Sequence, residues 1–230
     1  MKDAIITLCI GQDLHNPAVQ SMRLYAEKYD KDFFAIVTPK INRYNIYFEK
    51  YQYLELFKTY ERVLYLDSDV LITPHARNIF EYYADPQKFY AFDENADNEW
   101  MNREKWIDQM DVNFSWPVNW QGMRKYFNAG IQLVGKHNTF IQQILSTIFS
   151  PKNFAIDPSD QTILNYLCFK YAPYQFETLE YDFNRMDLGN YDLENKRYKA
   201  DFIHYAGPCK YGNGNKIETI ANDYKNLYEN

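Results

Sequence analysis

The chain has 230 residues and a formal net charge of −6, with 25 Lys and Arg against 31 Asp and Glu. This length allows one substantial core. The acidic balance excludes a general polyanion binder, because nucleic-acid binding through counterion release needs a basic surface. Apolar residues make up 46% of the chain and aromatic residues 18%, which excludes a disordered protein.

Short apolar runs alternate with helical patterns in the first half of the chain. Residues 4–10 and 33–38 are typical of strands, and residues 17–29 between them have the apolar spacing of a helix. These three segments predict a βαβ unit. A second helical pattern over residues 48–59 leads into a buried strand over residues 62–66. The predicted fold class is therefore α/β.

The second half is less regular. We expect a helix over residues 75–83 and a strand over residues 89–92, and then no sustained period up to residue 126. Such a long irregular segment predicts a site. We therefore interpret residues 94–126 as an acceptor-side insertion, which contains all four tryptophans of the chain: Trp100, Trp106, Trp116 and Trp120.

Regular structure is predicted to resume after this segment. Residues 127–134 read as a strand, and residues 138–149 and 158–169 as helices, the second capped by Ser159. The remainder reads as shorter strands and loops. Because no linker or repeat marks a second unit, we expect a single domain over residues 1–230.

The N-terminal apolar run and the cysteines bear on location. Residues 4–10 are too short to cross a membrane and lack a convincing cleavage site, so we expect no membrane span. Three widely separated cysteines predict neither a disulfide framework nor a zinc site. We therefore expect a cytoplasmic protein.

Two carboxylates follow the buried strand over residues 62–66. Asp67 and Asp69 stand one residue apart, so on an extended chain they share one face while Ser68 points to the other. Ligands of open α/β sheets bind at this end of the strands. Hard oxygen ligands suit Mg²⁺ or Mn²⁺, which take one or two protein carboxylates while substrate phosphates complete the shell. The alternative is an ordinary acidic strand end that faces solvent.

A second chemistry also uses an Asp-x-Asp pair after an apolar strand. In phosphotransferases of the haloacid-dehalogenase type, the first aspartate is a nucleophile. That pattern has Gly-Thr or Gly-Val after the second aspartate, at the N-terminal strand. Here Val70 and Leu71 follow, at a third strand.

Three further motifs follow in chain order. They are Phe127-Asn128-Ala129-Gly130, Asp160-Gln161-Thr-Ile-Leu-Asn165 and His204-Tyr-Ala-Gly207-Pro-Cys-Lys210. With the N-terminal strand and the acidic pair, they resemble glycosyltransferase family 8, the glycogenin-like and lipopolysaccharide galactosyltransferase-like enzymes. The resemblance implies a GT-A fold, which is a single Rossmann-like mixed sheet flanked by helices. The chain departs from the family at Tyr211, where Pro-Trp is common.

The resemblance also implies roles for particular residues. Asp67, Asp69 and His204 would bind the metal, while Asp160 would bind sugar hydroxyls and Gln161 would lie below the anomeric carbon. The remaining residues would contact the nucleotide-sugar donor: Thr7, Lys50, Ser68, Asp93, Asn128, Ala129, Gly130, Gly207 and Lys210. Ordinary structural roles stay open for several of them, such as a helix-dipole partner for Asp160 and a core histidine for His204.

The function implied by the resemblance is retaining transfer of a hexose from a UDP-sugar to a saccharide or glycan acceptor, with Mn²⁺ or Mg²⁺. Tryptophan faces in the irregular segment would stack on the acceptor sugar. Two alternatives remain: a non-catalytic protein that binds a nucleotide sugar, and a phosphotransferase with Asp67 as nucleophile.

Overall fold

The computed structural model describes residues 2–41, 45–97, 103–108, 115–118, 122–140, 143–144, 159–186, 195–207 and 215–229. Its strands are β1 (Asp3–Leu8), β2 (Asp32–Ile36), β3 (Arg62–Asp67), β4 (Val70–Ile72), β5 (Phe89–Ala91), β6 (Ile131–Gly135), β7 (Phe176–Thr178) and β8 (Phe202–His204). Its α-helices are α1 (Pro17–Lys28), α2 (Ile79–Tyr82), α3 (Glu94–Asp97), α4 (Glu104–Asp108), α6 (Asp160–Tyr171) and α7 (Lys216–Tyr228). Its 3₁₀ helices are η1 (Ile46–Lys58), η2 (Tyr181–Phe183) and η3 (Lys196–Lys199).

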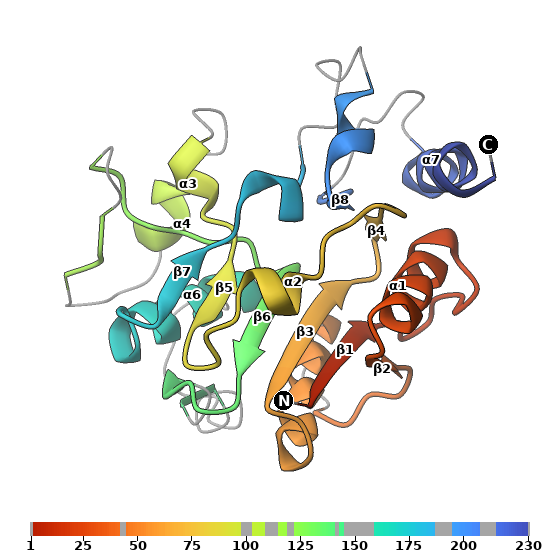
Figure 1. Cartoon of the computed structure of the whole chain (residues 1–230). Coiled ribbons are helices and arrows are strands. Elements are labelled where there is room, and N and C mark those ends of the chain that lie inside the picture. The colour runs from red at the N-terminus through yellow and green to blue at the C-terminus, as the bar shows by residue number, and fades with distance from the viewer. Residues whose placement is uncertain are drawn as a thin grey trace.

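A mixed six-stranded sheet forms the centre of the molecule, in the order β2-β1-β3-β6-β5-β7 (Figure 1). β1 pairs in parallel with both β2 and β3, whereas β6 runs antiparallel to β3 and β5. The predicted βαβ unit is confirmed, because α1 connects the parallel strands β1 and β2. The predicted mixed sheet flanked by helices is confirmed as well.

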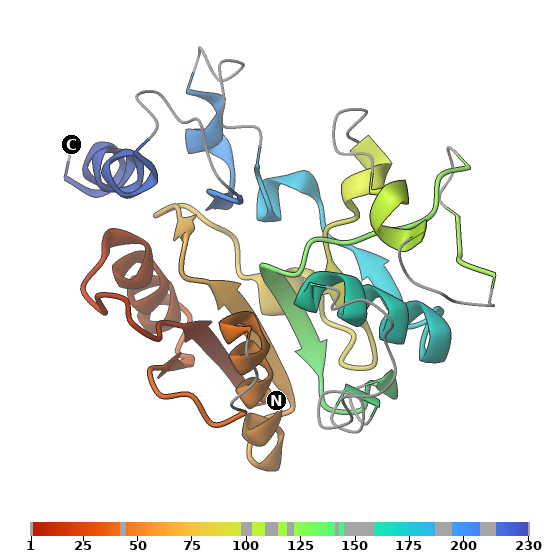
Figure 2. The same cartoon turned by 180° about the vertical axis from the view of Figure 1, so that it is seen from behind.

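Alternating strand residues fill two cores, one on each face of the sheet. Ile6, Val63 and Tyr65 pack with side chains of η1 and α6. Their neighbours Ile5 and Leu64 pack instead with side chains of α1 and α2. Figure 1 shows α2 on the near face of the sheet, and Figure 2, the opposite view, shows η1 and α6 on the other face. The strands are therefore buried on both faces, as their continuous apolar runs predict.

A small second sheet extends the fold above the carboxyl end of β3. β4 pairs antiparallel with β8, and the register places Val70 opposite His204. Leu71, Ile203 and Tyr205 form a third core with Ile220 of α7. This sheet brings the last third of the chain to the acidic pair.

Several sequence predictions are corrected at the level of elements. The remainder after residue 169 does not consist only of strands and loops, because α7 spans Lys216–Tyr228. The helix predicted over residues 48–59 is instead the 3₁₀ helix η1, which ends at Lys58, and the predicted helix over 75–83 is shortened to α2. The irregular segment contains α3 and α4. The cap is confirmed, since the Ser159 hydroxyl accepts from Thr162 N at 3.2 Å, whereas the predicted helix over 138–149 lies mostly outside the described residues.

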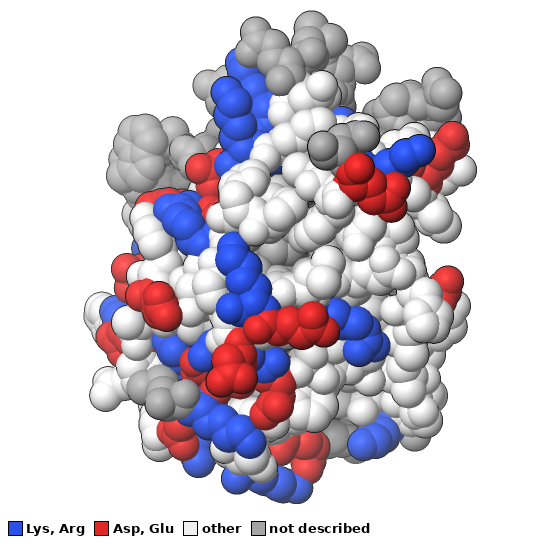
Figure 3. All heavy atoms as spheres, turned by 45° about the vertical axis from the view of Figure 1, so that its right-hand side comes forward, with Lys and Arg blue, Asp and Glu red and all other residues white. Residues whose placement is uncertain are grey.

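Surface charge is mixed rather than segregated on the face toward the right of Figure 1. Lys and Arg side chains lie beside Asp and Glu side chains there (Figure 3). Opposite charges also pair elsewhere in the described residues: Arg77 lies 2.5 Å from Asp201, and Arg197 lies 2.7 Å from Asp223. Within the described part of the chain, no helix is both long and apolar enough to cross a bilayer.

Candidate active site

Two neighbouring cavities lie at the carboxyl ends of β1 and β3. The first has a volume of about 610 Å³ and is lined by residues of η1, α6 and β8, among others. The second has a volume of about 690 Å³ and is lined by the segment after β1 and by α7. They share the residues Tyr47, Asp67, Asp69 and Lys216, which we call the junction. The cavities therefore form two halves of one site.

A carboxylate–imidazole cluster occupies this junction. Asp67 ends β3, Asp69 precedes β4, and His204 ends β8. The β4–β8 pairing places His204 next to Asp69, because Tyr205 N donates to Asp69 O at 3.0 Å. One possible ligand atom from each of Asp67, Asp69 and His204 lies within 4.8 Å of the others. The three side chains predicted to bind a metal are thus brought together.

Each carboxylate of the cluster uses one oxygen for a protein partner. The Tyr65 hydroxyl donates to Asp67 Oδ1 at 2.5 Å, and Lys50 Nζ lies 3.6 Å from the same oxygen. Lys216 Nζ lies 2.7 Å from Asp69 Oδ2. The buried Asp69 Oδ1 accepts no hydrogen bond from the described residues, and it lies 3.5 Å from His204 Nε2. Burial works to raise the pKa of Asp69, but His204 and Lys216 outweigh it and lower this pKa to about 2.

The imidazole is oriented by a residue that sequence reasoning missed. His204 Nδ1 lies 2.8 Å from Asn184 Oδ1, an oxygen that can only accept, so Nδ1 carries a proton and donates it. The other ring nitrogen, Nε2, then faces the two carboxylates. A partner of this kind fixes the tautomer of a metal-binding histidine.

Gly130 provides the space in front of the cluster. A Cβ on Gly130 would lie 2.3 Å from His204 Cε1 and 2.8 Å from both His204 Nε2 and Asp67 Oδ2. The same Gly130 is held to the end of β3, because Asp67 N donates to its carbonyl at 2.7 Å. Only glycine fits here without a shift of the ligand atoms.

The donor set of the cluster fits a hard divalent cation. The two carboxylates suit Mn²⁺ or Mg²⁺, and the imidazole nitrogen is a ligand that transition metals such as Mn²⁺ accept more readily than Mg²⁺ does. The unsatisfied Asp69 Oδ1 supports this fit, since a buried carboxylate oxygen without a donor is costly unless a cation satisfies it.

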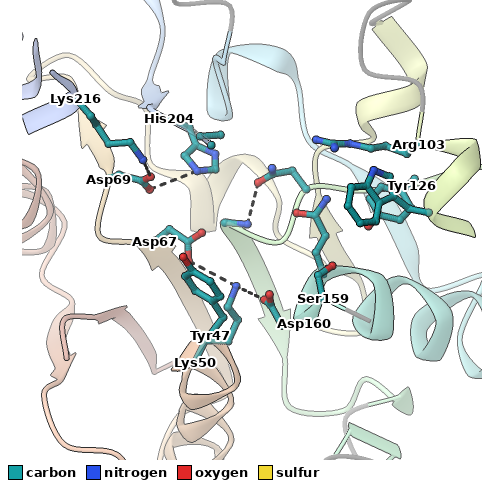
Figure 4. Close-up of a pocket in the computed structure, with 16 residues that line it drawn as sticks. Tyr47, Lys50, Asp67, Asp69, Arg103, Tyr126, Ser159, Asp160, His204 and Lys216 are labelled. Carbon is teal, nitrogen blue, oxygen red and sulfur yellow. Dashed lines mark hydrogen bonds and ion pairs between the residues drawn. The ribbon is translucent and has the colours of Figure 1, made fainter. Parts of the chain in front are cut away.

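Opposite the cluster, a buried lysine joins η1 to α6. Lys50 Nζ lies 2.7 Å from Asp160 Oδ2, and the side chains of Lys50 and Asp160 are 3% and 10% exposed. Burial works to lower the pKa of Lys50, but Asp160 and Asp67 raise it to about 12. Lys50 is therefore a permanent cation that lies between Asp67, a predicted metal ligand, and Asp160, a predicted sugar ligand. Figure 4 shows it between Asp67 and Asp160.

A second buried carboxylate, Glu94, organises the far wall of the first cavity. Asn128 Nδ2 donates to Glu94 Oε1 at 2.8 Å, and Arg103 Nε donates to Glu94 Oε2 at 2.6 Å. Gln161 Nε2 lies 3.4 Å from Glu94 Oε2, while its Oε1 accepts from Ala129 N at 3.1 Å. Glu94 thus orients the amides of Gln161 and Asn128.

A family model decides the identity of the chain. The model described as glycosyl transferase family 8 matches residues 12–211. The chain belongs to this family. A search of the curated proteins finds no match to the chain.

Solved structures show the same fold at low sequence identity. A glycosyltransferase involved in the glycosylation of the major capsid of PBCV-1 has a TM-score of 0.64 and 16% identity, over 96% of this chain and 99% of that one. The galactosyltransferase LgtC, in complex with donor and acceptor sugar analogues, has a TM-score of 0.56 and 16% identity, over 98% and 96%. GlyE of Streptococcus pneumoniae TIGR4 has a TM-score of 0.55 and 16% identity, over 97% and 60%. The fold is that of a GT-A glycosyltransferase.

Most of the side chains predicted from the family 8 resemblance line the cavities. Those of the first cavity are Lys50, Asp67, Asp69, Asn128, Gly130, Asp160, Gln161, His204 and Gly207, while Ser68 lines the second. Ala129 contributes its backbone to Gln161 and Lys50. Lys210 lies outside the described residues.

Besides Ala129, two of the described donor-binding predictions, Thr7 and Asp93, do not line either cavity. Thr7 is fully buried within β1. The Asp93 carboxylate accepts from the backbone N–H groups of Asn95 and Tyr126, at 3.2 Å and 3.1 Å. Burial raises the pKa of Asp93 to about 6. In this family 8 protein the neighbouring Glu94 reaches the amides of the site instead.

The described tryptophans divide between cavity and core. Trp106 lines the first cavity of this family 8 site. Trp116 is buried against Phe169, and its indole N–H donates to Lys125 O at 2.7 Å. Trp100 and Trp120 lie outside the described residues. Of the two described tryptophans, only Trp106 is therefore placed to meet a ligand in the first cavity.

Proposed function

We propose that this protein is a retaining glycosyltransferase that moves a hexose from a UDP-sugar to a saccharide acceptor with the help of Mn²⁺ or Mg²⁺. The observation that carries the proposal is the cluster of Asp67, Asp69 and His204 at the junction of two cavities. A nucleotide sugar has its charged diphosphate between a base and a sugar, which are both neutral. The site likewise has its charged cluster between two cavities.

The linings of the two cavities support this placement of the donor. The second cavity has apolar side chains beside the end of β1, which suit a planar base: Leu8, Ile10, Ile46, Ile217 and Ile220. The first cavity offers Asp160, Gln161 and Asn128, whose oxygens and amides suit sugar hydroxyls. The base and the sugar would therefore lie on opposite sides of the cluster.

The residues of the chain have distinct roles in this proposal. A divalent cation held by Asp67, Asp69 and His204 would supply positive charge to the departing diphosphate. Asn184 orients His204, and Gly130 keeps the space before it open. Lys50 holds the Asp160 carboxylate at the sugar end. With this charge compensation, no general acid is required to protonate the leaving group.

Same-face attack is the form of retention that the geometry favours. A covalent intermediate needs a carboxylate nucleophile against the sugar, yet Asp160 is paired with Lys50 and Glu94 with Arg103. Gln161 is a neutral amide whose orientation is set by Ala129 N and Glu94. We therefore assign Gln161 a supporting role beneath the sugar.

A saccharide acceptor is favoured by the rim of the first cavity. Trp106 offers an aromatic face, and Arg103 and Tyr126 offer polar groups beside it. Figure 4 shows Arg103 and Tyr126 on the side away from Lys216. Aromatic faces stack on the C–H surfaces of sugars, while N–H and O–H groups bond their hydroxyls.

The test is a panel of nucleotide sugars with Mn²⁺, in which nucleotide release and thermal stability are measured together. A donor at about a hundred times its Kd should add ~2.7 kcal/mol to the stability of the folded state. Release that needs Mn²⁺ and an added saccharide supports the proposal. Binding without any release indicates a non-catalytic nucleotide-sugar-binding protein, and a trapped phosphoryl group on Asp67 indicates a phosphotransferase.

A further inference from the structure

Lys216 lies in the first turn of α7 and reaches into the junction. Its Nζ is 2.7 Å from Asp69 Oδ2, and its side chain is 31% exposed. Figure 4 shows Lys216, Asp69 and His204 in sequence across the site. Lys216 stands outside the motif that ends at Lys210 and was not predicted from the sequence.

The position of Lys216 between the cavities indicates which part of a ligand it meets. Among the described residues that line both cavities, Lys216 is the one cation. Lys50 and Arg103 line only the first cavity. A ligand that fills both cavities must cross the junction with its central part. For a nucleotide sugar, that part is the diphosphate.

Lys216 leaves the metal-facing side of Asp69 free. It contacts Oδ2, whereas Oδ1 faces His204 and accepts no hydrogen bond from the described residues. A lysine and a divalent cation can therefore use opposite oxygens of the same carboxylate. Two positive charges would then lie side by side where phosphate oxygens pass.

Attachment of α7 does not explain the lysine, because α7 has other anchors. Ile220 packs in the third core, and the Tyr228 hydroxyl donates to Ile72 O at 2.7 Å. Asp223 accepts from the Tyr205 hydroxyl at 2.5 Å and pairs with Arg197. These contacts fix the helix without an ion pair at its exposed first turn.

We propose that Lys216 is a diphosphate-binding residue of this chain, with its ammonium group held on Asp69 and directed at the phosphate oxygens of the nucleotide sugar. The proposal rests on the proposed function, since it takes a nucleotide diphosphate as the ligand. Lysine binds phosphate as a compact point charge, and hydrogen bonds between charged groups are among the stronger ones.

The test compares Lys216→Met with Lys216→Arg and with Lys225→Met, which removes the same charge from the exposed far end of α7. Two affinities are measured by calorimetry: that for Mn²⁺ alone, and that for UDP at saturating Mn²⁺. In Lys216→Met, UDP should bind about tenfold more weakly, which corresponds to about 1.4 kcal/mol. Mn²⁺ alone should bind at least as well as in the wild type, because a neighbouring positive charge is gone. Lys216→Arg should restore most of the UDP affinity, and Lys225→Met should match the wild type.

Different results would overturn the inference in different ways. If Lys216→Met weakened Mn²⁺ and UDP equally, the lysine would merely orient Asp69. If UDP bound Lys216→Met as tightly as the wild type, the lysine would not touch the diphosphate. A wild-type protein that binds Mn²⁺ but not UDP would overturn the proposed function itself, whatever the variants do.

Discussion

The two sides of the first cavity treat their carboxylates differently. On the sugar side, Asp160 is paired with the buried Lys50, and Glu94 is paired with Arg103 and bonded by Asn128. On the metal side, Asp69 receives one ammonium group at Oδ2, and its buried Oδ1 accepts no hydrogen bond from the described residues. Both sides therefore pair their carboxylates with a cation, but the metal side also leaves Asp69 Oδ1 without a hydrogen-bond donor among the described residues.

This difference shows how a site can separate two kinds of ligand. A buried carboxylate oxygen without a partner is costly, so an unmatched oxygen marks where a cation from outside would be stabilised. A matched carboxylate has its geometry fixed and can still accept hydrogen bonds from neutral hydroxyls. The metal side is therefore suited to bind a cation, and the sugar side is suited to orient neutral hydroxyl groups.

The largest expected effect comes from neutralising Asp69, the carboxylate with the unmatched oxygen. Asp69→Asn should lower kcat/KM with Mn²⁺ by about 10³-fold, since charge stabilisation at a departing oxyanion is worth about 10²- to 10³-fold per group. It should also weaken Mn²⁺ binding in the absence of any nucleotide, which calorimetry measures. Asp85→Asn is the matched control, because exposed Asp85 precedes β5 at the opposite end of the sheet. Equal Mn²⁺ affinity in Asp69→Asn and wild type would refute the contrast between the two sides.

On the sugar side, the matched pair should show itself in stability. Lys50→Met leaves Asp160 buried without its cation and should cost about 3 to 5 kcal/mol of unfolding free energy, as loss of one partner of a buried ion pair does. The double variant Lys50→Met/Asp160→Asn removes both charges and should recover part of that loss. Urea unfolding of the two single variants and the double variant gives the coupling energy. Strict additivity would mean that the two charges do not compensate each other.

The orientation of His204 should have an intermediate effect. Asn184→Ala removes the acceptor of Nδ1–H and should weaken Mn²⁺ binding by about 10- to 100-fold, the usual cost of losing an outer partner of a metal ligand. Asn184→Asp keeps an acceptor at the same position and should restore much of the affinity. Loss of Mn²⁺ binding in Asn184→Asp as severe as in Asn184→Ala would show that Asn184 acts only through packing.

The parts of the fold that were predicted correctly depend on local patterns. The buried runs of β1 and β3, the amphipathic α1 and the Ser159 cap are each encoded within a few residues. α7 has a comparable local signal at its start. Asn215 caps the helix by accepting from Glu218 N, and an acidic residue in that position is typical of a helix start.

The rest of the site depends on tertiary packing that a single sequence does not display. His204 meets Asp69 only because β8 pairs with β4, and Asn184 reaches His204 from the turn after η2. Glu94 and Lys216 belong to no recognisable sequence motif. The sequence also does not show that Asp93 accepts from backbone N–H groups while the adjacent Glu94 accepts from the Asn128 side chain. The family resemblance supplied the ligand set, and the structure shows which side chains support it.

The smallest expected effect concerns Asp93, a sugar-side carboxylate that is matched by backbone N–H groups rather than by a cation. Its pKa of about 6 in the folded state lies above the ~3.9 of an unfolded chain. The folded state therefore binds more protons between pH 4 and 6, so this group contributes stability at low pH that is lost as the pH rises through 6. Asp93→Asn should raise the unfolding free energy by about 1 to 2 kcal/mol at pH 7.5 and have little effect at pH 4, since a neutral amide oxygen can accept the same two bonds. Urea unfolding at both pH values measures this, and UDP-sugar affinity is followed alongside. If the variant unfolded more easily at pH 7.5 and also lost donor affinity, the charged carboxylate would reach the sugar, as the family resemblance implies. The hydrogen bonds of Asp93 would then not fully account for its charge on the sugar side.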